Sequence, residues 1–293
     1  MDGKRDESMA VEPGLLPRSE YREIADRIPD GLYTKCDSPD CGELLYRKDL
    51  EKSLWVCPKC GRHFRLGARD RLALLLDEGS FSEFGANLIS CNPLGMPDYD
   101  SKLARYRKAT GENEAVITGL AAIGGHPVVV GITDPAFLMG SMGSVVGEKI
   151  ARAMERAIEL RHPCLMISGS GGGARMFEGI LSLMQMAKTC AAVGRMQKAG
   201  IFYITVLTDP TMAGVYASWA SLGDVVIAEP GAMIGFAGQR VYANTGSGMD
   251  PRIQTSEHQH ACGLLDLIVP RAQLRSTLER LLAIAYASPT HRK

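Results

Sequence analysis

Residues 168–188 read SGSGGGARMFEGILSLMQMAK, and this stretch decides the fold. It places a glycine cluster directly after the apolar run 165–167 and directly before a long helical pattern. Glycine has no Cβ, so its backbone N–H groups can approach a ligand closely, and the first turn of a helix leaves its N–H groups unpaired. We therefore predict a strand–loop–helix junction that binds an oxyanion or a phosphate.

A second junction of the same kind follows the apolar run 204–207. Its sequence, TDPTMAGVYASWA, covers residues 208–220 and again leads from an apolar run into a short helical pattern. Two loops rich in backbone donors, one strand–helix unit apart, suggest a site that stabilises enolate or acyl intermediates.

The surrounding chain predicts an α/β domain with parallel strands. The apolar runs PVVVGIT (127–133), PCLMIS (163–168), FYITVL (202–207) and DVVIAE (224–229) alternate with helical patterns, as in βαβ units. The uncharged segment 115–133 is long enough to suggest a membrane span, but its glycines and Pro127 favour a hairpin that turns at Gly124–Gly125.

The two long helical patterns of this domain differ in their surfaces. Residues 148–160 carry charges at three- and four-residue spacings, which indicates a solvated face without a chemical role. The helix predicted after Ala174 carries apolar side chains around much of its circumference, so we expect it to be buried in the core or at a subunit interface.

Four of the eight cysteines form a metal-binding pattern. Cys36 and Cys41 make a C-x4-C pair, and Cys57 and Cys60 make a C-x2-C pair after the strand-like stretch 43–56. Two close thiolate pairs can reach one tetrahedral ion, and about 35 residues are too few to form a stable core without it. We predict a structural Zn²⁺, since four sulfurs leave no open position for catalysis. The other cysteines, at 91, 164, 190 and 262, are interpreted as reduced packing residues.

The predicted zinc ribbon and the residues after it are basic. Residues 44–71 contain only three acidic residues, and their basic residues are Arg47, Lys48, Lys52, Lys59, Arg62, Arg65, Arg69 and Arg71. Three interpretations stay open: a solvated face, weak binding of nucleic acid, or guidance of the phosphates of a nucleotide-bearing substrate toward the glycine loops.

Composition and missing motifs narrow the function further. The 293 residues are 45% apolar with 33 basic and 33 acidic side chains, which argues against a general polyanion binder. The N-terminus has no secretory or transit signal, so we expect a cytoplasmic protein without a membrane segment. No nucleophile elbow, HExxH or P-loop motif occurs.

The remaining titratable candidates are weak. His258 and His260 are interpreted as surface or packing residues, and Asp209 and Glu178 beside the two loops as helix caps or dipole partners. The chemistry therefore points to a site made of backbone donors.

Together these motifs resemble the carboxyltransferase beta subunits of bacterial and plastid acetyl-CoA carboxylase. The resemblance runs from about Tyr33 to Ala285 and rests on the matching stretches CGELLYRKDLEKSLWVCPKC, LLLDEGSF, GSMGSVVGEKI, GGARM, SLMQMAKT, VLTDPT, AEPGAMIGFAG and SEHQHACGLLDLIV. It implies a crotonase (ClpP)-like ββα superhelix domain at residues 66–293 and a zinc ribbon at 31–65. Residues 1–30 carry no such resemblance, and their acidic, proline-containing composition suggests a mobile lead-in.

The resemblance also implies the activity and its site. Carboxybiotin, held on a separate carrier protein, supplies both the carboxyl group and the base, and acetyl-CoA is the substrate. Ala213 and Gly214 take the positions of the family's oxyanion pair. Substrate binding falls to the loops Gly140–Ser141–Met142 and Gly171–Gly172–Gly173–Ala174.

The implied partners are an alpha subunit in a heterotetramer of two alpha and two beta chains, the biotin carboxyl carrier protein and biotin carboxylase. The chain alone is expected to be inactive, because the second oxyanion pair belongs to the alpha subunit. ATP binding, nucleotide binding and fatty acid biosynthesis are expected of the whole system.

The sequence departs from the family pattern near the donor loops. One extra glycine lies in Gly171–Gly173, Ala213 replaces a glycine, Gln239 replaces a proline, and the stretch 242–255 diverges. Two alternatives therefore stay open beside the acetyl-CoA enzyme: a paralogue acting on another acyl-CoA, and a non-catalytic subunit that assembles or binds nucleic acid through its ribbon.

Overall fold

The computed structural model describes residues 31–237 and 250–287. The predicted lead-in 1–30, Gln239 and most of the divergent stretch 242–255 lie outside these residues. Within the described residues, no helix is both long and apolar enough to cross a bilayer.

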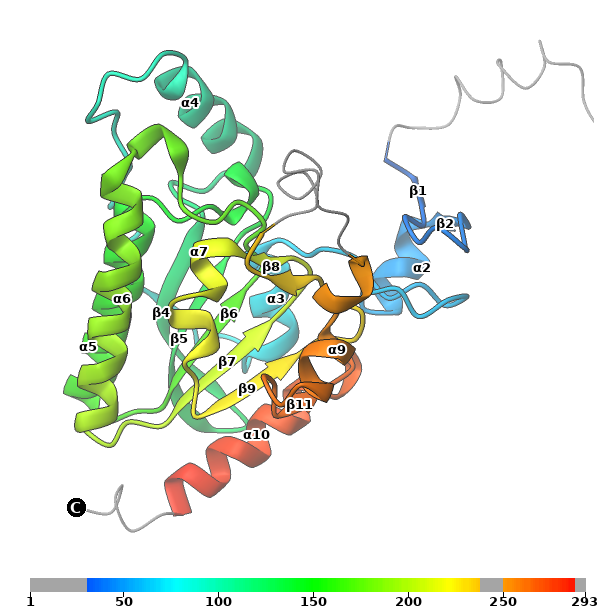
Figure 1. Cartoon of the computed structure of the whole chain (residues 1–293). Helices are drawn as coiled ribbons and strands as arrows, with labels where there is room; N and C mark the ends of the chain where they lie inside the picture. The colour runs from blue at the N-terminus through cyan, green and yellow to red at the C-terminus, as the bar shows by residue number, and fades with distance from the viewer. Residues whose placement is uncertain (1–30, 238–249, 288–293) are drawn as a thin grey trace, which may run out of the picture.

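The ribbon is a small body beside the α/β domain (Figure 1). Strands β1 (Tyr33–Lys35) and β2 (Leu44–Tyr46) pair antiparallel. The prediction of a strand over residues 43–56 is only partly confirmed. Residues 44–46 form β2, but residues 47–52 form helix α2 (Arg47–Lys52). Its sequence RKDLEK contains good helix formers with an Arg47–Glu51 pair at i,i+4, and Leu50 alone is buried.

A seven-stranded sheet in the order β11-β9-β7-β6-β5-β4-β3 forms the centre of the α/β domain. The hairpin turning at Gly124–Gly125 is confirmed, since β4 and β5 pair antiparallel on either side of it. The βαβ prediction is also confirmed, because β5, β6, β7, β9 and β11 pair in parallel. The strand bounds are β3 Ser82–Glu83, β4 Val116–Ile123, β5 His126–Thr133, β6 Cys164–Ser168, β7 Tyr203–Leu207, β9 Val225–Ala228 and β11 Leu267–Ile268.

Each face of the sheet packs against its own helices, because successive strand side chains point to opposite faces. One core contains Met166 of β6 with Ile150 and Met196 of helices α5 (Ser144–Leu160) and α6 (Ile180–Lys198). The other contains the neighbouring Ile167 together with side chains of α3 (Ala68–Leu75) and α10 (Arg271–Ala287). In Figure 1, α5 and α6 lie side by side along one side of the molecule. Helix α4 (Tyr99–Thr110) packs near their N-terminal ends.

The first glycine cluster does not open directly into a helix, contrary to the sequence prediction. A 3-10 turn, η2 (Met176–Glu178), and Gly179 with φ of +51° intervene before α6 begins at Ile180. A left-handed φ at Gly179 lets the chain change direction, which a helix running through it would not allow. The backbone N–H donors of this first loop therefore lie in the loop itself and are not the unpaired N–H groups of a helix N-terminus.

Short elements complete the domain around the second loop. Strand β8 (Thr211–Met212) pairs in parallel with β10 (Ile234–Gly235), and helix α7 (Ala213–Tyr216) follows β8 directly. The remaining short helices are η1 (Leu138–Gly140), η3 (Trp219–Ser221), η4 (Pro251–Gln254) and α9 (Ser256–Ala261).

Candidate active site and zinc ribbon

The first glycine loop follows β6 and folds back on the loop after β5. The N–H groups of Gly171 and Gly172 both donate to the Met139 carbonyl, at 2.9 and 3.1 Å. Gly173 has a φ of +56°, and its carbonyl accepts from Met142 N–H at 2.7 Å. The amides of Gly171 and Gly172 are thus bonded to the loop after β5, while those of Gly173 and Ala174 donate to no backbone acceptor among the described residues.

The second loop follows β7 and leads through β8 into α7. Ala213 and Gly214 are the first two residues of α7, so their N–H groups have no acceptor within that helix. Ala213 has a φ of +53°, a conformation that costs an L-residue with a Cβ about 1 kcal/mol. Met212 N–H donates to the Ser170 carbonyl at 2.8 Å and so joins this loop to the first one.

The two loops touch at their donor ends. A Cβ at Gly173 would lie 2.6 Å from the Ala213 Cβ and 3.5 Å from the Gly214 nitrogen. A Cβ at Gly214 would lie 3.6 Å from the Ala174 nitrogen. The structure therefore brings together Gly173, Ala174, Ala213 and Gly214, which the sequence predicted in two separate loops.

The Gly140–Met142 loop supports this arrangement. Its three N–H groups donate to Phe137, Leu138 and Gly173 carbonyls, so they serve the loop's own structure. Arg175 fixes this loop in place, because its guanidinium donates to the Ser141 carbonyl at 2.9 Å and to the Ser141 hydroxyl at 3.2 Å.

Arg175 is itself fixed by a buried acid, Glu114, that the sequence analysis did not single out. Its guanidinium pairs with Glu114 at 2.7 and 2.9 Å and also donates to the Tyr99 hydroxyl at 3.1 Å. Burial alone would lower the pKa of Arg175, but the Glu114 pair outweighs it and raises that pKa. Glu178 accepts from Ser144 N–H at 2.6 Å, so it serves the start of α5 and not the start of α6, the helix that follows its own loop.

A cavity lies where the ribbon meets the glycine loops. Its volume is about 210 Å³, and Arg65, Gly67, Met139, Gly171 and Pro210 are among the residues that line it. A larger cavity, of about 680 Å³ between β4 and α5, shares no lining residue with the glycine loops. A third cavity, of about 240 Å³, is lined by residues that include Ser141, Gly172 and Ala174, so it and the 210 Å³ cavity both adjoin the glycine loops.

The four predicted zinc ligands come together in the ribbon. The sulfurs of Cys36, Cys41, Cys57 and Cys60 all lie within 4.8 Å of one another, with Cys36 to Cys60 at 3.6 Å and Cys41 to Cys57 at 3.9 Å. Tetrahedral Zn–S bonds of about 2.3 Å place sulfurs about 3.8 Å apart, so these thiols fit one zinc ion. Around them Leu45, Leu50, Trp55 and Phe64 form a small separate core.

Most basic side chains of residues 44–71 are already paired with carboxylates. Such pairs are Arg47–Glu51, Lys52–Asp49, Lys59–Glu43, Arg62–Asp37, Arg65–Asp209, Arg69–Glu112 and Arg71–Glu229. Paired charges leave fewer cations for a phosphate backbone, which favours the interpretation of this region as a structural surface.

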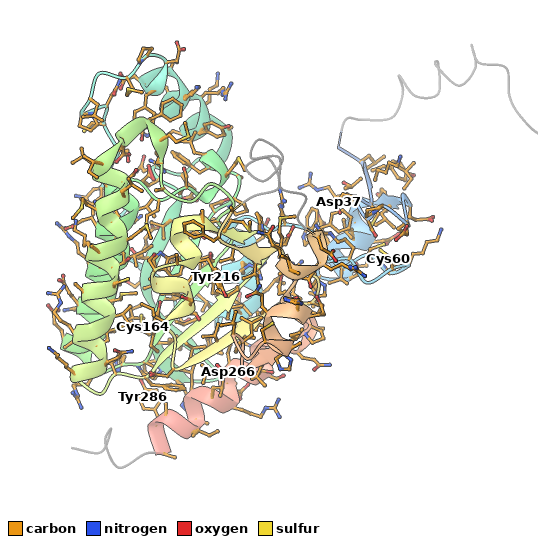
Figure 2. All side chains as sticks on the ribbon, viewed as in Figure 1. Asp37, Cys60, Cys164, Tyr216, Asp266 and Tyr286 are labelled. Atoms are coloured by element: carbon orange, nitrogen blue, oxygen red, sulfur yellow. The ribbon has the colours of Figure 1, made fainter. Side chains whose placement is uncertain are left out.

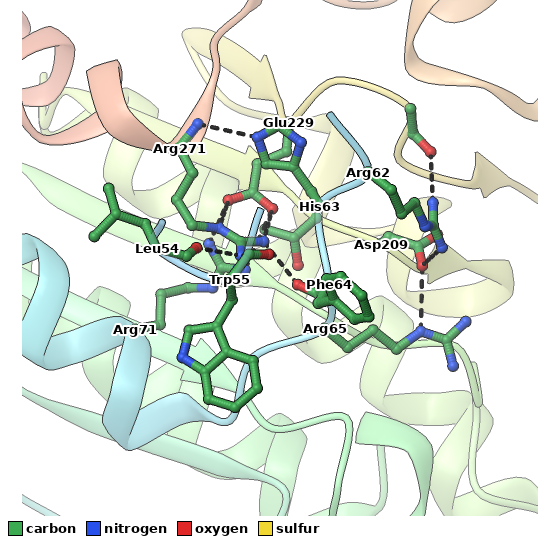
Figure 3. Close-up of polar contacts among 12 residues, drawn as sticks. Leu54, Trp55, Arg62, His63, Phe64, Arg65, Arg71, Asp209, Glu229 and Arg271 are labelled. Atoms are coloured by element: carbon green, nitrogen blue, oxygen red, sulfur yellow. Dashed lines mark hydrogen bonds and ion pairs between the residues drawn. The ribbon is translucent and has the colours of Figure 1, made fainter. Parts of the chain in front are cut away.

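Two carboxylates of the α/β domain attach the ribbon (Figure 3). Asp209 receives Arg62 at 2.9 Å and Arg65 at 3.2 Å, and we call these three residues the Asp209 cluster. Glu229 lies between Arg71 and Arg271, both at 2.8 Å, and these form the Glu229 cluster. Neither cluster was foreseen, since nothing in the spacing of these residues brings them together. The expectation that Asp209 caps a helix is wrong, because its oxygens accept from Arg62, Arg65 and the Met233 N–H.

Comparison with known proteins agrees with both parts of the chain. Residues 33–60 match the acetyl-CoA carboxylase zinc finger domain, and residues 62–278 match the carboxyl transferase domain. The acetyl-coenzyme A carboxylase carboxyl transferase subunit beta of Pelotomaculum thermopropionicum is 55% identical over 92% of this chain and 93% of its own length. The protein of the same name from Desulforamulus reducens is 53% identical over 94% and 95%. The chain belongs to this family of carboxyl transferase beta subunits.

Solved structures support the fold assignment. Transcarboxylase 12S, solved with methylmalonyl-coenzyme A and methylmalonic acid bound, aligns with a TM-score of 0.63 at 28% identity, covering 74% of this chain and 41% of that one. The Pseudomonas malonate decarboxylase heterodimer aligns with a TM-score of 0.59 at 26% identity, covering 75% and 86%. The predicted zinc ribbon followed by a crotonase-type carboxyl transferase domain is thus confirmed.

Among the residues given no chemical role from the sequence, Cys91 and Cys262 are exposed, so their interpretation as packing residues is wrong. His258 and His260 are exposed on α9. Cys164 is buried in the α/β domain, apart from Cys60 of the ribbon (Figure 2). The charged face of α5 is solvated and forms ion pairs such as Arg152–Glu148.

Proposed function

We propose that this chain is the beta half of a carboxyltransferase that moves a carboxyl group from carboxybiotin to acetyl-CoA, giving malonyl-CoA. The observation that carries the proposal is the meeting of two loops of backbone donors, in which the carboxylate of Asp209 is already paired with Arg62 and Arg65. Such a site suits a reaction in which enolate oxygens need N–H donors and the base comes from elsewhere. Biotin, delivered on a carrier protein, would supply the carboxyl group and the basic nitrogen.

The chain's own residues would bind and orient the thioester. Ala213 and Gly214 N–H groups would hold the enolate oxygen, and the neighbouring amides of Gly173 and Ala174 offer additional donors. Gly140–Met142 and Gly171–Gly172 would shape the substrate site around them.

An alpha subunit is part of the proposal. The relatives are named as beta subunits, and the malonate decarboxylase neighbour is a heterodimer. Apolar side chains of η2 and α6 stand exposed on this chain, among them Met176 at 86% and Ile180 at 63%. We propose that they pack on the alpha subunit in an assembly of two alpha and two beta chains, working with the carrier protein and biotin carboxylase in the cytoplasm.

Reconstitution tests the proposal. The chain co-purified with its alpha subunit should decarboxylate malonyl-CoA in the presence of biotin. Gly214→Val should lower that rate by about 10² or more, because a side chain there would obstruct the N–H donors. The control is Gly194→Val in α6, where an added Cβ meets no atom within 4 Å. Equal rates for both variants in an intact, zinc-loaded complex would exclude Gly214 from the site.

The substrate can be tested in the same complex. Acetyl-CoA and propionyl-CoA compete for one acyl site, so their kcat/KM ratio reports which the loop accommodates. A preference for propionyl-CoA would identify a paralogue for another acyl-CoA. Absence of transfer together with salt-dependent RNA binding would favour the non-catalytic alternative.

A further inference from the structure

The ribbon contacts the second donor loop directly, through the Asp209 cluster. We propose that Arg62 and Arg65 are positioning residues that hold Asp209 and thereby fix the backbone donors of Ala213 and Gly214. The ribbon would then contribute to turnover through this contact, in addition to binding zinc. The inference rests on the proposed function of Ala213 and Gly214.

Asp209 is held almost entirely by the ribbon. Its Oδ2 accepts from Arg62 Nη2 at 2.9 Å and from Arg65 Nε at 3.2 Å, while its Oδ1 accepts from Met233 N–H at 3.0 Å. Only 5% of the Asp209 side chain is exposed. Figure 3 shows both guanidinium groups directed at this one carboxylate.

A short chain of hydrogen bonds leads from Asp209 to the donors. Met233, which donates to Asp209, accepts from Thr211 N–H at 2.8 Å, so the carboxylate and the start of β8 share one partner. Met212 then donates to Ser170 of the first glycine loop, and Ala213 follows immediately. A displacement of Asp209 would therefore be passed to Ala213 within four residues.

Removing the arginines would leave a buried carboxylate with a single amide donor. A buried charge that loses its partners is strongly destabilised and moves toward water. Asp209 lies within the second loop, two residues after β7 ends at Leu207, so this movement would displace the loop and not the sheet. Since Ala213 already has an unfavourable φ of +53°, its loop depends on such external contacts.

The ribbon does not need the Asp209 cluster to stay attached. Arg271 of α10 donates to the Leu54, Trp55 and Phe64 carbonyls of the ribbon at 2.8 to 3.1 Å while it pairs with Glu229. Its backbone N–H also donates to His63 at 3.2 Å. Arg271 of the Glu229 cluster thus attaches the ribbon, so the Asp209 cluster is not required for that attachment.

The experiment compares three pairs of ribbon variants in the complex with the alpha subunit. Arg62→Met with Arg65→Met removes both charges at similar length, whereas Arg62→Lys with Arg65→Lys retains them. Lys59→Met with Glu43→Gln removes an exposed ribbon ion pair away from Asp209 and serves as the control. We expect the methionine pair to lower kcat for malonyl-CoA decarboxylation about tenfold with little change in KM, and the lysine pair to recover most of it.

A second readout separates positioning from stability. Amide hydrogen exchange should accelerate at residues 208–214 in the methionine pair, with zinc content, assembly and exchange of residues 33–60 unchanged. A kcat within about twofold of the control, or a loss that appears only with zinc release, would overturn the inference. If Gly214→Val is inactive while the methionine pair is fully active, the proposed function stands and only the inference fails.

Discussion

At the scale of single residues, Ala213 and Gly173 explain each other. Ala213 adopts a left-handed φ that glycine would adopt freely, and its Cβ occupies the space that a Cβ at Gly173 would need. The extra glycine of the first loop and the alanine of the second are therefore sterically linked. The sequence could identify both departures, but only the 2.6 Å separation between the two Cβ positions joins them.

This link predicts the outcome of exchanging the two residues. Gly173→Ala should lower activity at least tenfold, because its Cβ collides with that of Ala213, and Ala213→Gly in the same chain should recover part of the loss. Ala213→Gly alone removes about 1 kcal/mol of backbone strain, so activity should be equal or higher. Turnover of the four proteins in the assembled complex measures the coupling, and additive effects would show that the two sites are independent.

The same swap also tests whether the alanine selects the substrate. If the Ala213 methyl group only fills space above Gly173, Ala213→Gly leaves the ratio of acetyl-CoA to propionyl-CoA turnover unchanged. If the methyl group limits the acyl site, the smaller residue shifts that ratio toward propionyl-CoA, by up to the 10- to 200-fold range that one methylene can supply, about 1–3 kcal/mol.

At the scale of elements, the strands, their parallel order, the hairpin and α5 follow from the sequence. Alternating runs such as 163–168 and 202–207 encode them locally. The residue at which α6 begins and the helical conformation of α2 could not be predicted from the sequence, because the periodicity of apolar residues reports neither feature. Gly179 turns the chain before α6, and α2 buries only Leu50. The charge clusters are harder still, since Arg71 and Glu229 are 158 residues apart.

The ribbon should lose its structure without zinc before the α/β domain does. Its core contains only a few apolar side chains besides the cysteines, too few to offset the entropy of ordering the chain. Chelation should therefore accelerate proteolysis within residues 33–65 at temperatures where the α/β domain stays folded. Cys57→Ser should bind less than one zinc per chain; full zinc content with an ordered ribbon would disprove the four-thiolate site.

The Glu229 cluster predicts a stability that depends on pH. Burial alone would raise the pKa of Glu229, but Arg71 and Arg271 outweigh it and hold that pKa well below its usual 4.5. A carboxyl whose folded pKa is depressed stabilises the fold fully above its unfolded pKa, and this contribution is lost as pH falls below about 4.5.

Urea unfolding of wild type and Glu229→Gln measures this contribution. At pH 7 the variant should be less stable by about 3 kcal/mol, because it leaves two buried arginines without their acid. The difference should shrink as pH falls below about 4.5, and zinc release at acid pH affects both proteins alike. A difference that does not vary with pH would mean that the charge of Glu229 is not what stabilises the cluster. Glu159→Gln, which breaks an exposed pair, should have little effect.

At the scale of the whole molecule, the first turns of α6 expose an apolar surface. The sequence predicted that the helix after the first glycine loop is buried in the core or at an interface, and the structure excludes the core for its first turns. Leu183 and Met184 of α6 are 51% and 55% exposed, near Ile180 and Met176. An apolar patch of this kind on one side of a helix pair is typical of a protein–protein contact.

This surface decides whether the chain works alone. Ile180→Asp with Met184→Asp, one turn apart on α6, should abolish assembly with the alpha subunit and activity together, because charges would be buried at the contact. Both side chains are exposed, so the substitutions should leave the fold intact, and the variant should still bind one zinc per chain. Ile284→Asp on α10, where Ile284 is 68% exposed, is the matched control and should assemble normally. Sedimentation of each variant with the alpha subunit measures the outcome. The unaltered chain alone should be insoluble or an inactive oligomer, and a stable, fully active species containing only this chain would refute the requirement for a partner.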